Sequence, residues 1–402
     1  MDKKSNSQAI KKQTTKFFIA SSVIILIVLA RSNPLLFKDG TSYVSNWRYT
    51  HYLFNYDDEF VKRGFIGELI SLFSNHISYA QVSFFSYIAL SILFFCFFYF
   101  FSKPYFYYGK RLGAFFLMIF ASTSPATLQH FALDVGRFDV IIYSIFILLI
   151  LIINSFSKKS TFTTFIIINL GLFLSVLVHE AAFFMTLPLS IVFWNYIDHS
   201  KKGFTLQIIS FTFILFLTYF ISTRGEYTSL DFESHLEKLK TIYGDRVIDD
   251  SLSVIHHTSI KENLNLTMQV GINLNRLLHH IIFAFFMLPF FYLIYKLYLS
   301  VKSQLNFRIG FILLSALSPL ALYPLGYDHF RWWSLAITNF IISIFFIILQ
   351  DNIIRDNVLS FFEDREKLIA FVVFIGFISG PLGVIESFDF IEYIVRGVKY
   401  FS

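Results

Sequence analysis

An all-α bundle of membrane-spanning helices is the fold class that this sequence predicts, and three observations lead to it. The 402 residues are 55% hydrophobic and 15% charged, whereas a soluble protein carries about 25% charged residues. Apolar runs long enough to cross a bilayer recur along the whole chain. These runs lack the short alternating pattern of a membrane β-barrel. We therefore expect one polytopic integral membrane domain over residues 1–402.

The apolar runs predict about eleven spans. The first begins at Phe17 and ends near Ala30. No small-residue cleavage site follows it, so we interpret it as a retained helix rather than a signal peptide. The later spans are expected at 83–102, 113–129, 139–156, 161–179, 181–197, 204–222, 277–299, 309–325, 334–350 and 368–385.

Basic residues predict the side of the membrane on which each connection lies. Residues 1–16 contain five lysines and one acid, which indicates a cytoplasmic tail. Short basic turns are expected on the same side, at Lys103/Lys110/Arg111, Lys158/Lys159, Lys201/Lys202, Lys302/Arg308 and Arg355/Arg365/Lys367. The long segments 31–82 and 223–276 then become outer loops, and the tail 386–402 also lies outside. We expect a bacterial cytoplasmic (inner) membrane protein with a cytoplasmic N-terminus.

An acidic cluster in the first outer loop, Asp57-Asp58-Glu59, is the leading candidate for catalysis. A carboxylate can act as a general base that takes a proton from an attacking hydroxyl. Adjacent acids can also hold a divalent cation, the only cofactor that these residues suggest. Alternatively, the cluster is a solvated loop in which Glu59 pairs with Arg63 one helical turn away. Because that pairing would occupy Glu59, we expect Asp58, then Asp57, to be the base.

Residues 60–74 after the acids predict an amphipathic helix at the membrane interface. Its apolar half is made of Val61, Phe65, Ile66, Leu69, Ile70 and Phe73. Its other half is made of Arg63, Gly67, Ser71 and Ser74.

A tight outer turn, Leu133–Asp139, is the second cluster, and Gly136 permits its bend. Arg137 can hold a phosphate or carboxylate through two parallel hydrogen bonds. Alternatively, it pairs with Asp134 or Asp139 and fixes the turn.

The pair His179-Glu180 ends a span and forms the third cluster. Position 183 is Phe, so the pair does not belong to the HExxH pattern of zinc proteases. A histidine at a helix end is most often structural, and Glu180 beside it adds the alternative of a substrate-binding pair.

The fourth cluster is the outer turn 326–333, with the candidates Asp328, His329 and Arg331 beside two tryptophans. The aromatic residues suit a membrane interface, or the face of a sugar ring. We interpret the pairs His256/His257 and His279/His280 as structural or surface residues.

All four clusters are expected at one membrane face, where they can activate a hydroxyl and hold an anionic leaving group. The sequence shows no Gly-rich phosphate loop for a nucleotide, and Cys96 is its only cysteine. The net charge of +6 is read as a topology signal, and no nucleic-acid partner is expected.

The order of basic tail, first span, Asp57-Asp58-Glu59 and 60–74 helix resembles the GT-C class of membrane glycosyltransferases. The Phe-rich spans and two large outer loops are similar to O-antigen and capsule polymerases. The resemblance covers the layout and one short motif, and the chain departs from many GT-C members in lacking a C-terminal soluble domain. It implies an enzyme of surface polysaccharide assembly that takes sugars from polyprenyl-phosphate carriers, beside other proteins of that assembly in the bilayer.

Two alternatives remain open. A transporter or flippase of lipid-linked glycan would carry charges near the middle of the bilayer and an internal repeat. The charges here cluster at helix ends, and no repeat is found. A non-catalytic membrane component is the other alternative.

Overall fold

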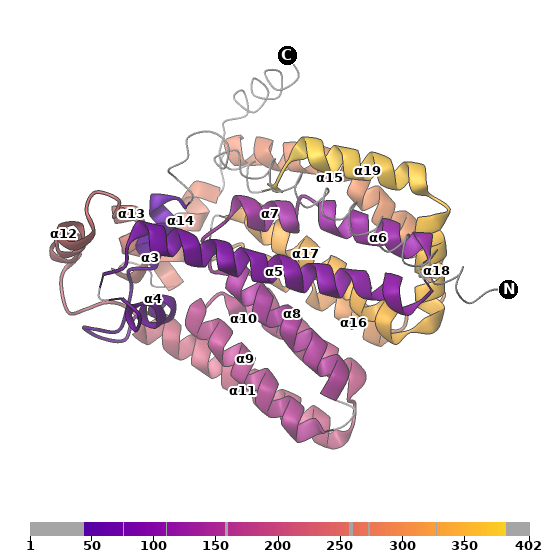
Figure 1. The fold of residues 1–402 in the computed structure, drawn as a ribbon, viewed down its shortest axis with the longest axis horizontal. Helices are drawn as coiled ribbons and strands as arrows, with labels where there is room; N and C mark the ends of the chain where they lie inside the picture. The colour runs from indigo at the N-terminus through magenta and orange to yellow at the C-terminus, as the bar shows by residue number, and fades with distance from the viewer. Residues whose placement is uncertain are drawn as a thin grey trace, which may run out of the picture.

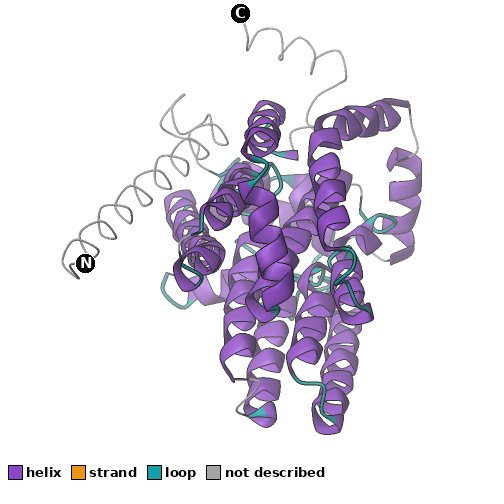
Figure 2. Ribbon diagram, turned by 90° about the vertical axis from the view of Figure 1, so that its right-hand side faces the viewer, coloured by secondary structure: helices purple, strands orange, loops and turns teal. Residues whose placement is uncertain are grey.

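The computed structural model describes residues 44–74, 76–109, 111–156, 160–256, 260–271, 274–326 and 328–382. The regular elements of these residues are all helices, and they include no strand (Figures 1 and 2). The all-α prediction is therefore confirmed. The expected tail 1–16, the first span and the tail 386–402 lie outside the described residues.

The helices follow one another closely along the chain. Before residue 200 they are α3 (Asn46–His51), α4 (Gly64–Ser71), α5 (Tyr79–Tyr107), α6 (Leu112–Thr123), α7 (Leu128–Leu133), α8 (Asp139–Phe156), α9 (Thr161–Val178) and α10 (Ala182–Ile197). After residue 200 they are α11 (Lys201–Arg224), α12 (Phe232–Tyr243), α13 (Asp249–His256), α14 (Ile260–Gly271), α15 (Leu274–Val301), α16 (Phe307–Ser315), the 3₁₀ helix η1 (Ser318–Leu322), α17 (His329–Gln350), α18 (Asn352–Glu363) and α19 (Glu366–Ser379).

Six helical stretches in the described residues are long and apolar enough to cross a membrane: α5, α6 with α7, α9, α11, α15 and α17. Helices α8 and α10 are apolar but shorter. The apolar part of α17 is 83% buried, which makes it the central helix, whereas that of α11 is only 28% buried. Apolar side chains that face outward over most of a helix need lipid rather than water around them. The structure is therefore compatible with a membrane protein.

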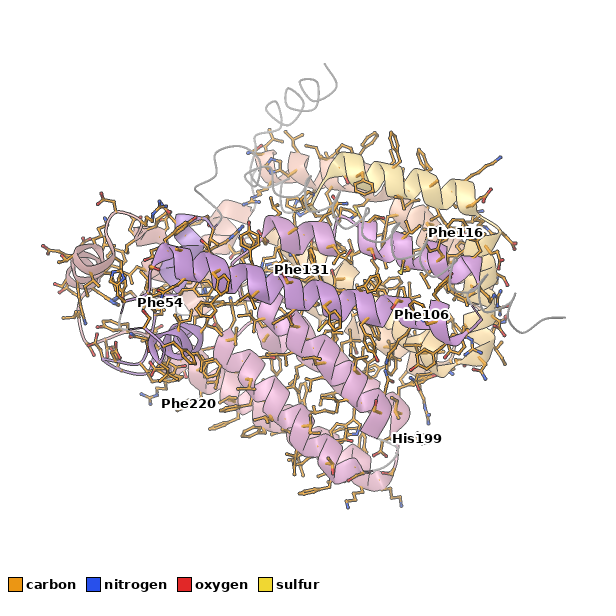
Figure 3. The ribbon with its side chains drawn as sticks, viewed as in Figure 1. Phe54, Phe106, Phe116, Phe131, His199 and Phe220 are labelled. Carbon is orange, nitrogen blue, oxygen red and sulfur yellow. The ribbon has the colours of Figure 1, made fainter. Side chains whose placement is uncertain are left out.

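The bundle has two distinct ends, which α5 connects (Figure 1). Helices α3, α4, α12, α13 and α14 gather at one end, and α18 closes the other. Phe54 and Phe220 lie toward the first end, and Phe106 and His199 toward the second (Figure 3). At the α18 end, Arg111 pairs with Asp356 at 3.1 Å, and Gln350 donates to Asn154 at 2.7 Å. The segment 223–276, which was expected as the second outer loop, contains α12, α13 and α14 among its described residues, and these helices lie at the first end (Figure 1).

The amphipathic helix after the acids is α4, which is shorter than the expected 60–74. Its expected division into two faces was wrong. Gly67 was placed on the polar half but is buried, and Leu69 and Phe73 are 40% and 83% exposed. The reason is close packing, because a Cβ atom on Gly67 would lie 2.0 Å from the carbonyl oxygen of Phe54. Only glycine lets this face of α4 rest on the preceding chain.

Candidate functional site

A cavity of about 670 Å³ opens at the α3–α4 end of the bundle. Its volume lies within the range of ligand sites, roughly 300–1,000 Å³. Side chains from widely separated segments line it, and the charged ones are Lys62, Arg63, Arg137, Glu180, Asp328 and Arg331. The structure therefore brings together charged residues from three of the four sequence clusters, with Arg63 of the 60–74 segment, which follows the first cluster, beside them. The substrate-binding candidates that meet here are Arg63, Arg137, Glu180, Asp328 and Arg331.

Asp328 is held by two arginines at the start of α17. Nη1 of Arg137 donates to its Oδ2 at 2.9 Å, and Nη1 of Arg331 donates to the same oxygen at 3.0 Å. Among the described residues, Oδ1 of Asp328 has no hydrogen-bond partner. The carboxylate therefore has one oxygen fixed by the protein and a second one available to a ligand.

Asp139, the first residue of α8, anchors Arg331. Its Nε and Nη2 donate to the two Asp139 oxygens at 2.8 and 2.6 Å, which is a bidentate pair. Asp139 is fully buried, and its N-terminal position on α8 also suits a negative charge. The pair fixes the guanidinium of Arg331 at the cavity wall.

Asp134 is a structural residue of the α7–α8 turn. Nη2 of Arg48 donates to its Oδ1 at 2.7 Å, and Nη1 of Arg48 donates to the carbonyl oxygens of Leu133 and Val135. Nε of Arg137 lies 3.6 Å from Asp134. Gly136 has φ 90° in this turn, which only glycine adopts readily. Asp134 does not line the cavity, and it holds the turn that presents Arg137.

Arg63 and Glu180 form the opposite wall. Nη2 of Arg63 donates to Oε1 of Glu180 at 2.6 Å, and its Nε lies within 3.3 Å of both oxygens. Nδ1 of His179 accepts from the backbone N–H of Ala181 at 3.1 Å and also lines the cavity. The expected Glu59–Arg63 pair is replaced by this longer-range one.

Arg63 has the only positive φ of a non-glycine residue in the described chain, 64°. The left-handed region costs an ordinary residue about 1–2 kcal/mol. The neighbouring backbone holds it there, since the N–H of Lys62 donates to the carbonyl of Gly225 at 2.9 Å. Strain of this kind is concentrated at functional sites.

The three acids of the first outer loop lie away from the cavity lining. Oδ2 of Asp58 accepts from Tyr227 at 2.6 Å and from Lys238 at 2.7 Å. Glu59 accepts from the backbone N–H groups of Thr228 and Ser229. Asp57 is exposed and accepts from Asn55. These residues tie the first outer loop to the second, and the structure does not bring them to Arg137 or Asp328.

The described residues do not form a binding site for the divalent cation that the acids suggested. Among the described residues, no group of three or more His, Cys, Asp or Glu side chains is arranged to hold a metal ion. Asp58 and Glu59 accept hydrogen bonds from Tyr, Lys and backbone donors instead.

His329 lies beside the cavity rather than in its lining. Its ring stacks on Tyr323 at 4.3 Å and 3°, which is a packing contact. Trp332 does line the cavity, and the guanidinium of Arg331 lies 4.6 Å from its ring. Of the two tryptophans in the fourth cluster, Trp332 therefore belongs to the site.

Sequence reasoning missed three cavity residues from the first outer loop: Trp47, His51 and Lys62. Trp47 and His51 are four residues apart on α3, a spacing that places them on one helical face. That spacing was the signal that could have found them. Lys62 precedes Arg63 directly and was visible as half of a basic pair.

The electrostatic character of the cavity is cationic. Four cations and two carboxylates line it, namely Lys62, Arg63, Arg137 and Arg331 against Glu180 and Asp328. Burial, and then Arg63, lower the pKa of both His51 and His179, so both imidazoles are neutral at pH 7. A cationic site with aromatic walls suits an anionic ligand.

Comparisons with models of protein families, with characterised proteins and with solved structures find no match to this chain. The functional argument therefore rests on the site itself.

Proposed function

We propose that the protein is a membrane glycosyltransferase or polymerase of surface polysaccharide assembly, of the O-antigen or capsule type. It would act on polyprenyl-phosphate-linked sugars at the outer face of the cytoplasmic membrane. The observation that carries the proposal is the cavity in which cations, carboxylates and aromatic side chains from distant segments meet.

The anionic part of the substrate fits the arginines. Arg63 uses Nε and Nη2 toward Glu180, and Arg137 uses Nη1 toward Asp328. Nη1 of Arg63 and Nη2 of Arg137 have no hydrogen-bond partner among the described residues. Guanidinium N–H groups that the protein leaves available match the oxygens of a phosphate.

The base proposed from the geometry is Asp328, in place of the acids of the first outer loop. The acceptor hydroxyl oxygen attacks the anomeric carbon, and the bond from that carbon to the phosphate oxygen breaks. The phosphate leaves with the electron pair, and the hydroxyl proton passes to Oδ1 of Asp328. Burial raises the pKa of Asp328, but Arg137 and Arg331 outweigh it and hold this pKa well below its ordinary value. The carboxylate is therefore ionised at neutral pH, and as a weak base it takes the proton only as the hydroxyl oxygen bonds to the anomeric carbon and becomes strongly acidic.

The proposal includes about eleven spans, with the N-terminus in the cytoplasm. Every apolar run expected from residue 83 onward coincides with a helix or a pair of short helices, including α8, α10, α16 with η1, and α19. The basic residues Arg111 and Arg355 lie toward the α18 end, opposite the cavity. The positive-inside rule then supports placing the cavity at the outer face.

A reconstituted reaction tests the proposal. The purified full chain is placed in vesicles with a defined polyprenyl-diphosphate-linked oligosaccharide, and new glycosidic bonds are measured. We expect transfer by the native protein and a loss of roughly 10²–10⁴ in rate for Asp328→Asn, since that is the usual cost of removing a general base. Asp356→Asn on α18 is the matched control and should keep the native rate.

The alternatives give different results in the same vesicles. Movement of the lipid-linked sugar across the membrane without a new bond would identify a transporter. The absence of both bond formation and movement would favour a non-catalytic component. Full activity in Asp328→Asn would show that Asp328 is not the base and would leave Asp58 and Asp57 as the candidates.

A further inference from the structure

His51 is a buried imidazole that the proposed reaction does not use. It is 6% exposed, ends α3 and lines the cavity. Among the described residues, its Nε2 has no hydrogen-bond partner. Aromatic rings surround it, with Trp47 edge-on at 4.1 Å and Phe54 at 5.5 Å. Buried polar atoms are as a rule hydrogen-bonded, so an imidazole with an unpartnered nitrogen in the cavity wall is a candidate for contact with a ligand.

His51 shares the cavity wall with both arginines that were assigned to the anion, Arg63 and Arg137. The guanidinium of Arg137 lies 5.5 Å from the ring of Trp47, which contacts His51 edge-on. Burial, and then Arg63, lower the pKa of His51 and keep its imidazole neutral, and His179 and Arg137 act in the same direction. Glu180 of the α9–α10 connection opposes them.

We propose that His51 takes up a proton when a phosphate-class anion binds between Arg63 and Arg137, and that the imidazolium then donates a hydrogen bond to the anion. A dianion at this position cancels the repulsion from the arginines and adds an attraction of its own, which favours the charged imidazole. The identity of the anion as a polyprenyl phosphate rests on the proposed function, but the proton uptake does not require any sugar transfer.

His179 is the competing candidate, and its contacts argue against it. Its Nδ1 already accepts from the N–H of Ala181, and it lies 3.3 Å from Oε2 of Glu180. The side chain is therefore committed to the α9–α10 connection. His51 has no such commitment at Nε2.

Proton uptake makes anion affinity depend on pH. With the anion bound, His51 has a higher pKa than in the free protein. A higher pH therefore weakens anion binding. Between the two pKa values of His51, the affinity should fall about tenfold for each unit of pH. Sulfate does not titrate between pH 6 and 8, so a sulfate affinity that stays constant over this range in the native protein would overturn the proposal without any variant.

Calorimetry on the full chain in lipid nanodiscs measures the proton directly. Two probes are titrated at pH 7 in buffers of different ionisation enthalpy: inorganic sulfate, which does not titrate in this range, and farnesyl monophosphate. We expect about 0.5–1 proton taken up per anion by the native protein and close to none by His51→Gln. His199→Gln, at the opposite end of the bundle, is the control and should match the native protein.

The outcomes separate the possibilities. Uptake with farnesyl monophosphate alone identifies a lipid headgroup, and uptake with sulfate as well identifies a general site for tetrahedral anions. Unchanged uptake in His51→Gln, or uptake lost in His179→Gln and kept in His51→Gln, would refute the assignment, as would the absence of binding by both probes. Retained uptake together with no glycan transfer would contradict the proposed reaction alone.

Discussion

Arg137 and Arg331 donate to the same oxygen of Asp328, yet the protein uses their other N–H groups differently. Arg331 is also bound in a bidentate pair by the fully buried Asp139, whereas Nε of Arg137 lies 3.6 Å from Asp134 and its Nη2 has no hydrogen-bond partner among the described residues. Arg331 is therefore an anchored wall of the site, and Arg137 is the better ligand for a phosphate. Sequence reasoning treated the two as equivalent, because it could not show which arginine meets Asp139.

Replacement of each arginine by lysine should separate these roles. Arg137→Lys should stay folded but lose most glycan transfer, since one ammonium cannot reproduce a fork of N–H groups. Arg331→Lys should unfold more easily, because an ammonium cannot reproduce the two parallel hydrogen bonds to the buried Asp139. Thermal unfolding in detergent and the vesicle assay measure the two effects. Equal stability of both variants would contradict the distinction.

At the scale of elements, the acids of the first outer loop form a junction with the second outer loop, 223–276. This junction consists of Asp58 with Tyr227 and Lys238, and of Glu59 with the backbone at Thr228 and Ser229. It directly adjoins the cavity, because Lys62 and Arg63 follow it in the chain and line the site. The acids thus bind the second outer loop next to the chain that leads to Arg63.

The junction should resist mild acid and open when its acids are removed. The hydrogen bond from Lys238 is the main cause of the lowered pKa of Asp58. Burial raises the pKa of Glu59, but the donors at Thr228 and Ser229 outweigh it and lower this pKa as well. A depressed carboxyl pKa gives stability above the ordinary value that is lost only as the pH falls through the lowered one. Contacts should therefore persist at pH 5.

Hydrogen exchange over residues 226–231 provides the measurement. We expect protection to be similar at pH 7 and pH 5 after correction for the intrinsic rate. The double variant Asp58→Asn/Glu59→Gln should exchange faster there. Asp57→Asn should behave as the native protein, because the Asp57 carboxylate accepts a hydrogen bond from Asn55 of its own loop and none from 226–231 among the described residues. Equal protection in the double variant would show that other contacts hold the loop.

The sequence could predict the helices, but not which residues contact one another in the segments between them. Apolar runs are local patterns, so each expected run from residue 83 on meets a helix. The partner of Glu59 lies 169 residues away, while the sequence offered Arg63 four residues on. For the same reason the sequence could not show that Gly67 packs against the backbone of Phe54, which lies in the chain before the helix. Arg137, Glu180 and Asp328 could be named beforehand because charged residues at the ends of apolar runs are unusual in themselves.

At the scale of the whole molecule, the two ends of the bundle differ in their charge chemistry. The cavity end pairs its arginines with carboxylates inside a hollow, as in Arg331–Asp139 and Arg63–Glu180. Exposed cations occur at both ends, with Lys201 and Lys302 in short turns and Lys238 and Lys240 on α12 of the cavity end. The positive-inside rule gives most weight to the short turns, which supports an outward-facing cavity.

Single cysteines test this orientation. In a Cys96→Ala background, Ser45→Cys and Ser229→Cys place exposed thiols at the cavity end, and Ser303→Cys places one in the turn after α15. A membrane-impermeant maleimide applied to intact cells should label the first two. It should label Ser303→Cys only after the membrane is permeabilised, because the basic turns are held on the cytoplasmic side. The reverse pattern would place the cavity in the cytoplasm, where nucleotide sugars are available, and would remove the reason for a lipid-linked donor. Labelling of all three in intact cells would mean that the two ends do not lie on opposite faces of the membrane.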